Sequence, residues 1–140
     1  MRRITVLVLV VALTLLVTAP VTAAASCARL TGFATIETDP STSTATGSAL
    51  VVHGGSPAVV PFDSALGPTT ATQHWFFAAG TVTLLEHAAP VAIPGTTLLT
   101  IDSDVEVAAG GTGALTYRGL FDTATNTGAF VVRGRLCIDG

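Results

Sequence analysis

The feature that most constrains the fold of this chain is its pair of cysteines, Cys27 and Cys137, which stand near opposite ends of the sequence. A bond between them closes a loop of about 110 residues, and the chain-entropy model values such a loop at about 4 to 5 kcal/mol. A catalytic pair would more often occupy a C-x-x-C motif beside a helix. We therefore expect a structural disulfide, formed in an oxidising compartment, that holds the two ends of the chain side by side.

The N-terminal segment has the composition of a secretion signal. Two arginines supply positive charge at its start, residues 4–17 are mainly apolar, and the alanines at 23–25 form a small-residue cleavage site. The apolar segment is too short for a transmembrane helix, which needs about 20 apolar residues. The sequence thus predicts a signal peptide over residues 1–25, a secreted mature domain over 26–140, and no membrane span after cleavage.

A second interpretation of the same region is a lipoprotein signal. Ala24-Ala25-Ser26-Cys27 would then be a lipobox, and Cys27 would carry the acyl chains. An alanine stands where leucine is usual, and acylation of Cys27 would leave Cys137 as an unpaired thiol in an oxidising compartment. Soluble export is therefore preferred, with the lipid anchor as the alternative.

The charge of the mature chain argues against nucleic-acid binding. Its four arginines, at positions 29, 118, 133 and 135, are outnumbered by nine carboxylates, and lysine is absent from the whole sequence. Binding to a phosphate backbone requires clustered positive charge that displaces counterions. The mature length of about 115 residues suits one hydrophobic core and is too small for two domains.

Outside the leader, the sequence predicts an all-β fold. Val, Thr, Ile and Phe are abundant, Gly, Pro, Asn and Asp interrupt the chain about every ten residues, and no window has a helical period. We expect a small closed antiparallel β-barrel of about eight strands, because pairing the first strand with the last removes open sheet edges. The expected strands cover residues 27–36, 49–53, 58–62, 73–78, 81–87, 96–107, 114–121 and 129–138. Two segments rich in Ser and Thr, 37–48 and 63–72, are expected to be loops.

The last expected strand gives the clearest orientation. Its inward face should carry Phe130, Val132, Gly134, Leu136 and Ile138, because alternate side chains of a strand share one face. An antiparallel pairing of the two cysteines places Arg29 opposite Arg135, a mildly repulsive contact. The same register places Leu30 opposite Gly134 on the inner face, which matches a large residue with a small one.

Three segments of the second half carry a resemblance to a known family. They are F-A-A-G-T-V-T-L-L-E-H from Phe77, T-T-L-L-T-I-D-S-D-V-E-V-A-A-G-G-T-G from Thr96, and G-L-F-D-T-A-T-N-T-G-A-F-V-V-R-G-R-L-C from Gly119. Together they resemble the actinobacterial secreted proteins with an allene oxide cyclase barrel-like, or dirigent-like, domain. Those proteins have an F-x-x-G-T strand pair, a G-G-T-G turn, a D-x-x-T-G hairpin and a terminal cysteine.

The resemblance covers roughly the second half of the chain, and it implies a barrel and an isomerase or cyclase activity. Its motifs are mostly turn glycines, which specify hairpins more than a reaction. Gly113 is followed at once by Ala-Leu-Thr-Tyr-Arg, where the family has a stretch of aromatic residues, alanine and glycine, so we expect a shorter barrel rim. No site position of the plant enzymes that share this domain type can be matched to this sequence, so the resemblance transfers no catalytic residue.

His74 and Glu86 form the candidate catalytic pair. A three-residue hairpin loop at 78–80 would place both side chains on one face of the hairpin. On an inward face, burial would raise the pKa of the glutamate, and the pair would exchange protons with a bound ligand. In the alternative, Trp75 points inward and the two candidates form a solvent-exposed pair worth well under about 1 kcal/mol.

Asp102, Asp104 and Glu106 alternate along one expected strand and project from one face. Calcium requires oxygens at about 2.3–2.6 Å around one centre, whereas alternate side chains of a strand lie about 7 Å apart. A solvated outer face is therefore preferred to a calcium site. The three histidines lack the paired spacing of a zinc site, so we expect no metal and no cofactor.

Tyr117 shares a strand face with Leu115, Gly119 and Phe121, and an inward hydroxyl there would orient a ligand in an apolar interior. Together with Trp75 it is the candidate ligand contact. The favoured function is an exported barrel that binds a small apolar molecule, because a closed barrel with few interior charges suits such a ligand. The alternatives are an isomerase or cyclase, and a structural or cell-surface interaction protein whose packed core holds nothing.

Overall fold

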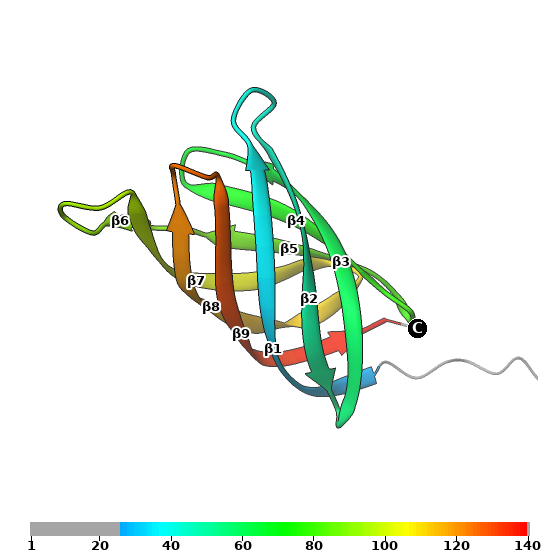
Figure 1. Ribbon diagram of the computed structural model, residues 1–140. Helices are drawn as coiled ribbons and strands as arrows, with labels where there is room; N and C mark the ends of the chain where they lie inside the picture. Colours follow the sequence, from blue (N-terminus) through cyan, green and yellow to red (C-terminus); the bar gives the residue numbers. More distant parts are fainter. Residues whose placement is uncertain (1–25, 140) are drawn as a thin grey trace, which may run out of the picture.

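The strands, with the bounds given by the structure, are β1 (Ser26–Asp39), β2 (Thr44–His53), β3 (Ser56–Leu66), β4 (Thr70–Phe77), β5 (Gly80–His87), β6 (Val91–Ala92), β7 (Leu98–Ala109), β8 (Gly111–Asp122) and β9 (Thr127–Ile138). In the computed structural model they form a single sheet that curls into a barrel (Figure 1). β1 pairs with both β2 and β9, and β5 pairs with both β4 and β7, so eight strands close on themselves. β6 pairs with the start of β7. The expected closed antiparallel barrel is confirmed.

The structure describes residues 26–139. The predicted signal peptide over residues 1–25 lies outside this range, as does Gly140. Within the range, no helix has the length and apolar character needed to cross a membrane.

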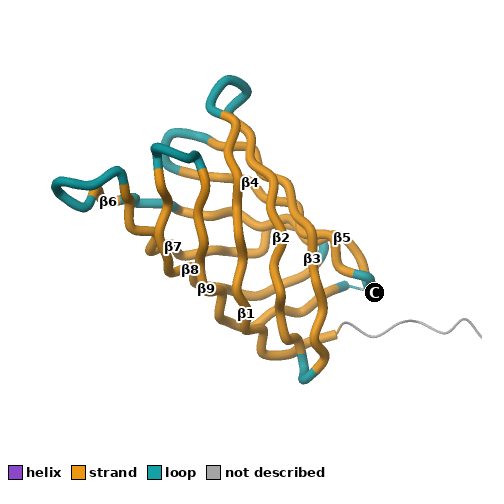
Figure 2. The backbone as a smooth tube through the Cα atoms, in the orientation of Figure 1, coloured by secondary structure: helices purple, strands orange, loops and turns teal. Residues whose placement is uncertain are grey.

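Short turns at both ends of the barrel connect most neighbouring strands (Figure 2). Gly54 and Gly55 link β2 to β3 with φ angles of 60° and 83°, a left-handed conformation that glycine adopts without side-chain strain. The turn from β8 to β9 ends at Asn126 with φ 56°, and asparagine tolerates this conformation better than most residues. Turn length fixes the strand register, and the register decides which side chains point inward.

The pairing of β1 with β9 closes the barrel, and the Cys27–Cys137 disulfide ties these two strands together. The Cα atoms of the two cysteines lie 3.9 Å apart. Arg29 lies opposite Arg135, and Leu30 lies opposite Gly134, as the sequence predicts. The covalent link therefore stands at the seam where the first and last strands meet.

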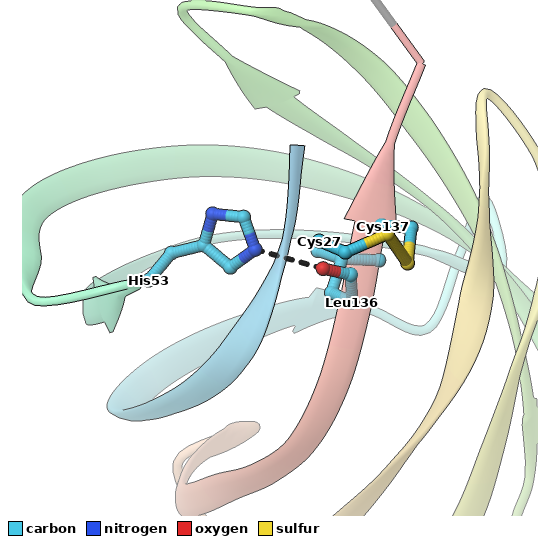
Figure 3. The surroundings of a disulfide bond; sticks show 4 residues. All are labelled: Cys27, His53, Leu136 and Cys137. Atoms are coloured by element: carbon cyan, nitrogen blue, oxygen red, sulfur yellow. Dashed lines mark hydrogen bonds between the residues drawn. A yellow bond between two sulfur atoms is a disulfide. The ribbon is translucent and has the colours of Figure 1, made fainter. Parts of the chain in front are cut away.

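His53 reinforces the end of the barrel that holds the disulfide (Figure 3). Its Nε2 atom lies 2.8 Å from the carbonyl oxygen of Leu136 on β9, although β1 separates β2 from β9 in the sheet. The imidazole ring also lies 6.4 Å from the ring of Phe77, measured between ring centroids. These contacts connect strands across the barrel and help to close this end.

An aromatic cluster fills the middle of the barrel. The rings of Phe62 and Trp75 stack with centroids 5.0 Å apart, and those of Tyr117 and Phe130 with centroids 4.5 Å apart. Such pairs are worth about 0.5–1.5 kcal/mol beyond the area that they bury. The inward residues of β9 include Phe130, Val132, Leu136 and Ile138, all buried as predicted.

Both segments expected to be loops, 37–48 and 63–72, are mostly strand, so this prediction is wrong. Each consists of two strand ends joined by a short turn, and the first turn occupies only residues 40–43. The Ser- and Thr-rich composition hides an alternation in which Ala45 and Ser64 are buried between exposed neighbours. These small residues keep the inward and outward alternation of a strand but leave space in the interior, so this end of the barrel is open.

Candidate functional site

An open pocket of about 640 Å³ occupies the end of the barrel opposite the disulfide. Its rim comes from the β1–β2 and β3–β4 turns and from the segments that follow β5 and β8. The volume falls in the range of small-molecule pockets, about 300–1,000 Å³. The wall is mainly apolar, with Ile36, Leu66, Ala71, Ile101, Phe121 and Phe130 among its residues.

Glu86 is the only acidic or basic residue among the described residues that line this pocket. Its carboxylate accepts hydrogen bonds at both oxygens. Ser103 on β7 donates from Oγ to Oε1 over 2.9 Å, and Gln73 on β4 donates from Nε2 to Oε2 over 3.0 Å. Because Gln73 and Ser103 are buried, Glu86 connects the open pocket to a polar network inside the core.

Gln73 fixes the orientation of that network. Its Oε1 atom accepts a hydrogen bond from Nε1 of Trp75 at 2.9 Å and another from the hydroxyl of Tyr117 at 2.8 Å. An indole nitrogen can only donate, so the amide oxygen must face Trp75 and the amide nitrogen must face Glu86. The carboxyl group of Glu86 is thus held in place by neighbours that are themselves held, as a preorganised site requires.

Burial raises the pKa of Glu86 above its ordinary value, and the hydrogen bond from Ser103 opposes part of this effect. Burial, reinforced by the negative charge of Glu86, also raises the pKa of Tyr117 well above its ordinary range. Tyr117 therefore stays protonated and remains a donor to Gln73. Glu86 is the group suited to proton exchange with a bound molecule, because its raised pKa lies closer to neutral pH.

The structure separates His74 from Glu86. A two-residue turn, rather than the three-residue loop expected at 78–80, joins β4 to β5. His74 consequently points outward, where its Nδ1 atom lies 2.8 Å from Oδ1 of Asp63 and the two side chains are 45% and 53% exposed. The expectation that His74 and Glu86 share one face is wrong, because a one-residue change of register reverses the face of a side chain.

Trp75 and Tyr117, the candidate ligand contacts, both point inward and are fully buried. Neither residue belongs to the pocket lining. They lie beneath the pocket and reach it through their shared hydrogen-bond partner Gln73. A direct contact of either side chain with a ligand stays a prediction.

Gln73 and Ser103 are site residues that the sequence reasoning missed. A signal for Ser103 was present, because an outer face that carries Asp102 and Asp104 requires Ser103 between them to point inward. Gln73 is two residues from Trp75 and therefore shares its strand face. The sequence alone did not show that this face points inward, because that depends on the register of the β4–β5 hairpin. A polar residue at an inward position of a strand is the pattern that both share.

Asp102, Asp104 and Glu106 project outward from β7 and are exposed, as expected. Oδ1 of Asp102 lies 3.6 Å from Nε of Arg118, and Oε1 of Glu106 lies 3.7 Å from Nε2 of His87. In the part of the chain that the structure describes, no three Asp, Glu, His or Cys side chains are grouped to hold a metal ion.

A comparison with protein-family models finds no matching family, and comparisons with curated proteins and with solved structures find no similar chain. The function is therefore inferred from the geometry of the pocket and from the residues that line it.

Proposed function

We propose that this protein is an exported barrel that binds a small, mainly apolar molecule in its open end. The observation that carries the proposal is a pocket of about 640 Å³ with apolar walls and a single carboxyl group. Apolar surface buried there contributes about 25 cal/mol per Å². The carboxylate of Glu86 can accept one oriented hydrogen bond, which suits a ligand with a single hydroxyl group.

Export accords with the covalent chemistry of the chain. Disulfides form and persist in oxidising environments, and Cys27 is bonded to Cys137. A sulfur in a disulfide cannot also carry an acyl chain, which favours soluble release over a lipid anchor at Cys27. The sequence of residues 1–25 has the features of the signal that such a route needs.

Filling the pocket tests the binding proposal. Ala71 lines the pocket and lies opposite Glu86 in the β4–β5 pair, so Ala71→Phe should occupy the ligand's space. Ala65→Phe is the matched control, because Ala65 is exposed on β3. Native mass spectrometry of the secreted protein, with titration of a medium-chain fatty alcohol, measures binding.

We expect the wild type and Ala65→Phe to bind with similar affinity, and Ala71→Phe to bind at least about tenfold more weakly, the effect of losing about 1.4 kcal/mol. A wild-type protein that retains no apolar molecule and binds no such probe would instead be a packed structural barrel. Equal binding by Ala71→Phe would place any ligand elsewhere.

An isomerase or cyclase is a second candidate. It is favoured by the position of Glu86, whose carboxyl group faces the pocket and is held by Gln73 and Ser103. Glu86→Gln keeps both hydrogen bonds, since an amide can accept from Gln73 and donate to Ser103, but it cannot transfer a proton. Turnover of a candidate substrate should therefore disappear while the melting temperature is not lowered. Equal loss of turnover and stability would make the residue structural.

A further inference from the structure

The four arginines of residues 26–139 lie on one part of the outer barrel wall. Arg29 is on β1, Arg118 is on β8, and Arg133 and Arg135 are on β9, and all four are exposed. β8, β9 and β1 are consecutive neighbours in the sheet. This range contains no lysine, so its permanently positive side chains are confined to this one patch.

Two of these arginines face each other at close range. Arg29 lies directly opposite Arg135, two residues along each strand from the Cys27–Cys137 pair. Residue pairs alternate between close and wide spacing along antiparallel strands, so the arginine pair has the close spacing of the cysteine pair. The disulfide therefore stands beside two like charges, whose mild repulsion an anion between them would relieve.

A third arginine completes a hollow. Arg133 lies on the same face as Arg135, about 7 Å along the strand. The hollow has a volume of about 570 Å³, and Thr31 and Gly134 complete its lining together with Arg29. Three guanidinium groups and a threonine hydroxyl, all capable of donating hydrogen bonds, thus surround one concave surface.

No carboxylate of the described residues lies within 4.0 Å of the guanidinium groups of Arg29, Arg133 or Arg135. The acidic side chains of β7 are separated from β9 by β8, whose facing residues Ala114 and Thr116 carry no charge. Within residues 26–139, these three arginines thus form no salt bridge, in a chain whose net charge is negative.

We propose that this hollow binds a phosphate group, either free or as the headgroup of an anionic phospholipid. The planar fork of a guanidinium donates two parallel hydrogen bonds to phosphate oxygens, and several such forks around one centre match an anion with several oxygens. The hollow lies at the disulfide end of the barrel, away from the open pocket. The proposal is therefore independent of the ligand bound there.

An apolar row beside the hollow favours the phospholipid as the source of the phosphate. Val131, Phe33, Leu50 and Val59 lie opposite one another in turn across β9, β1, β2 and β3. They are 38%, 53%, 61% and 69% exposed. A membrane surface presents phosphates directly above apolar chains, which is the order of groups on this wall.

Binding to two probes tests the proposal. Calorimetric titration with inorganic pyrophosphate reports the free anion, and co-sedimentation with phosphatidylcholine vesicles, with and without phosphatidylglycerol, reports the headgroup. Arg133→Gln/Arg135→Gln should weaken binding by at least about tenfold, because it removes two charge-assisted contacts. Its melting temperature should equal or exceed that of the wild type, because the repulsion with Arg29 is relieved.

Arg118→Gln is the control for loss of a nearby surface arginine, since Arg118 is paired with Asp102 and lies outside the hollow. It removes one positive charge, whereas the double variant removes two. It should change affinity by less than about threefold at physiological salt, where distant charges are screened. If the phospholipid headgroup is the ligand, Phe33→Ser should weaken vesicle binding and leave pyrophosphate binding unchanged. If free phosphate is the ligand, Phe33→Ser should change neither the calorimetric titration nor the co-sedimentation. Binding of neither probe by the wild type, or equal losses in the double variant and in Arg118→Gln, would overturn the proposal.

Discussion

Gln73 is the residue on which the buried polar network depends, and its replacement by leucine gives the sharpest test of that network. The change removes three hydrogen bonds and leaves the indole N–H of Trp75 and the hydroxyl of Tyr117 without their acceptor. Both donors belong to residues that are 0% exposed. Each buried donor without a partner costs about 1–3 kcal/mol, so we expect Gln73→Leu to lose about 2–6 kcal/mol of the free energy of unfolding.

Tyr117→Phe turns this loss into a double-mutant cycle. In the wild type it should cost about 0.5–1.5 kcal/mol, because it removes one hydrogen bond to Gln73. In the Gln73→Leu background it removes a hydroxyl that has already lost its acceptor, so it should be neutral or stabilising. Urea denaturation at neutral pH measures all four corners of the cycle. An equal cost of Tyr117→Phe in both backgrounds would refute the assignment of Gln73 as the acceptor.

Three further perturbations have defined outcomes. Because the pKa of Glu86 is raised in the folded state, the protonated carboxyl stabilises the wild type at acidic pH, and this stability is lost as pH rises through that pKa. Glu86→Gln should therefore become progressively more stable relative to the wild type from acidic to weakly basic pH, as measured by urea denaturation. Replacing Cys27 and Cys137 by alanine removes a disulfide between residues 110 apart in sequence and should cost about 5 kcal/mol of the free energy of unfolding. A loss below about 1 kcal/mol would contradict the stabilising role of this disulfide. Gly47→Val should lower the melting temperature in calorimetry, because a Cβ at position 47 meets the ring of Phe62 and would force the core to shift at a cost of about 1–3 kcal/mol.

The seam between the first and last strands was predictable because two strong local signals agree there. The alternation of β9 identifies its buried face, and the two cysteines fix its register with β1. The β4–β5 hairpin lacked such an anchor, since Ala78-Ala79-Gly80 suits a loop of two or of three residues, and the difference decides whether His74 points inward or outward.

The open pocket at the end of the barrel opposite the disulfide was the feature that the sequence predicted least well. Its inward positions on β2 are small, so the strand around Ala45 has the composition of a solvated loop. Periodicity methods register apolar bulk, and small residues that line an open pocket provide little of it. The position of Glu86 beneath this opening depends on the pairing of β5 with both β4 and β7, which no local pattern specifies.

The most direct measurement of the central claim uses Trp75, the only tryptophan of the chain, which lies beneath the open pocket and is linked to Glu86 through Gln73. A brominated fatty alcohol bound in the pocket should quench the fluorescence of Trp75 in a saturable manner, and Ala71→Phe should remove this quenching while the protein remains folded. Fluorescence that declines only in proportion to the quencher in solution, or quenching that is unchanged in Ala71→Phe, would contradict a ligand site at this end of the barrel.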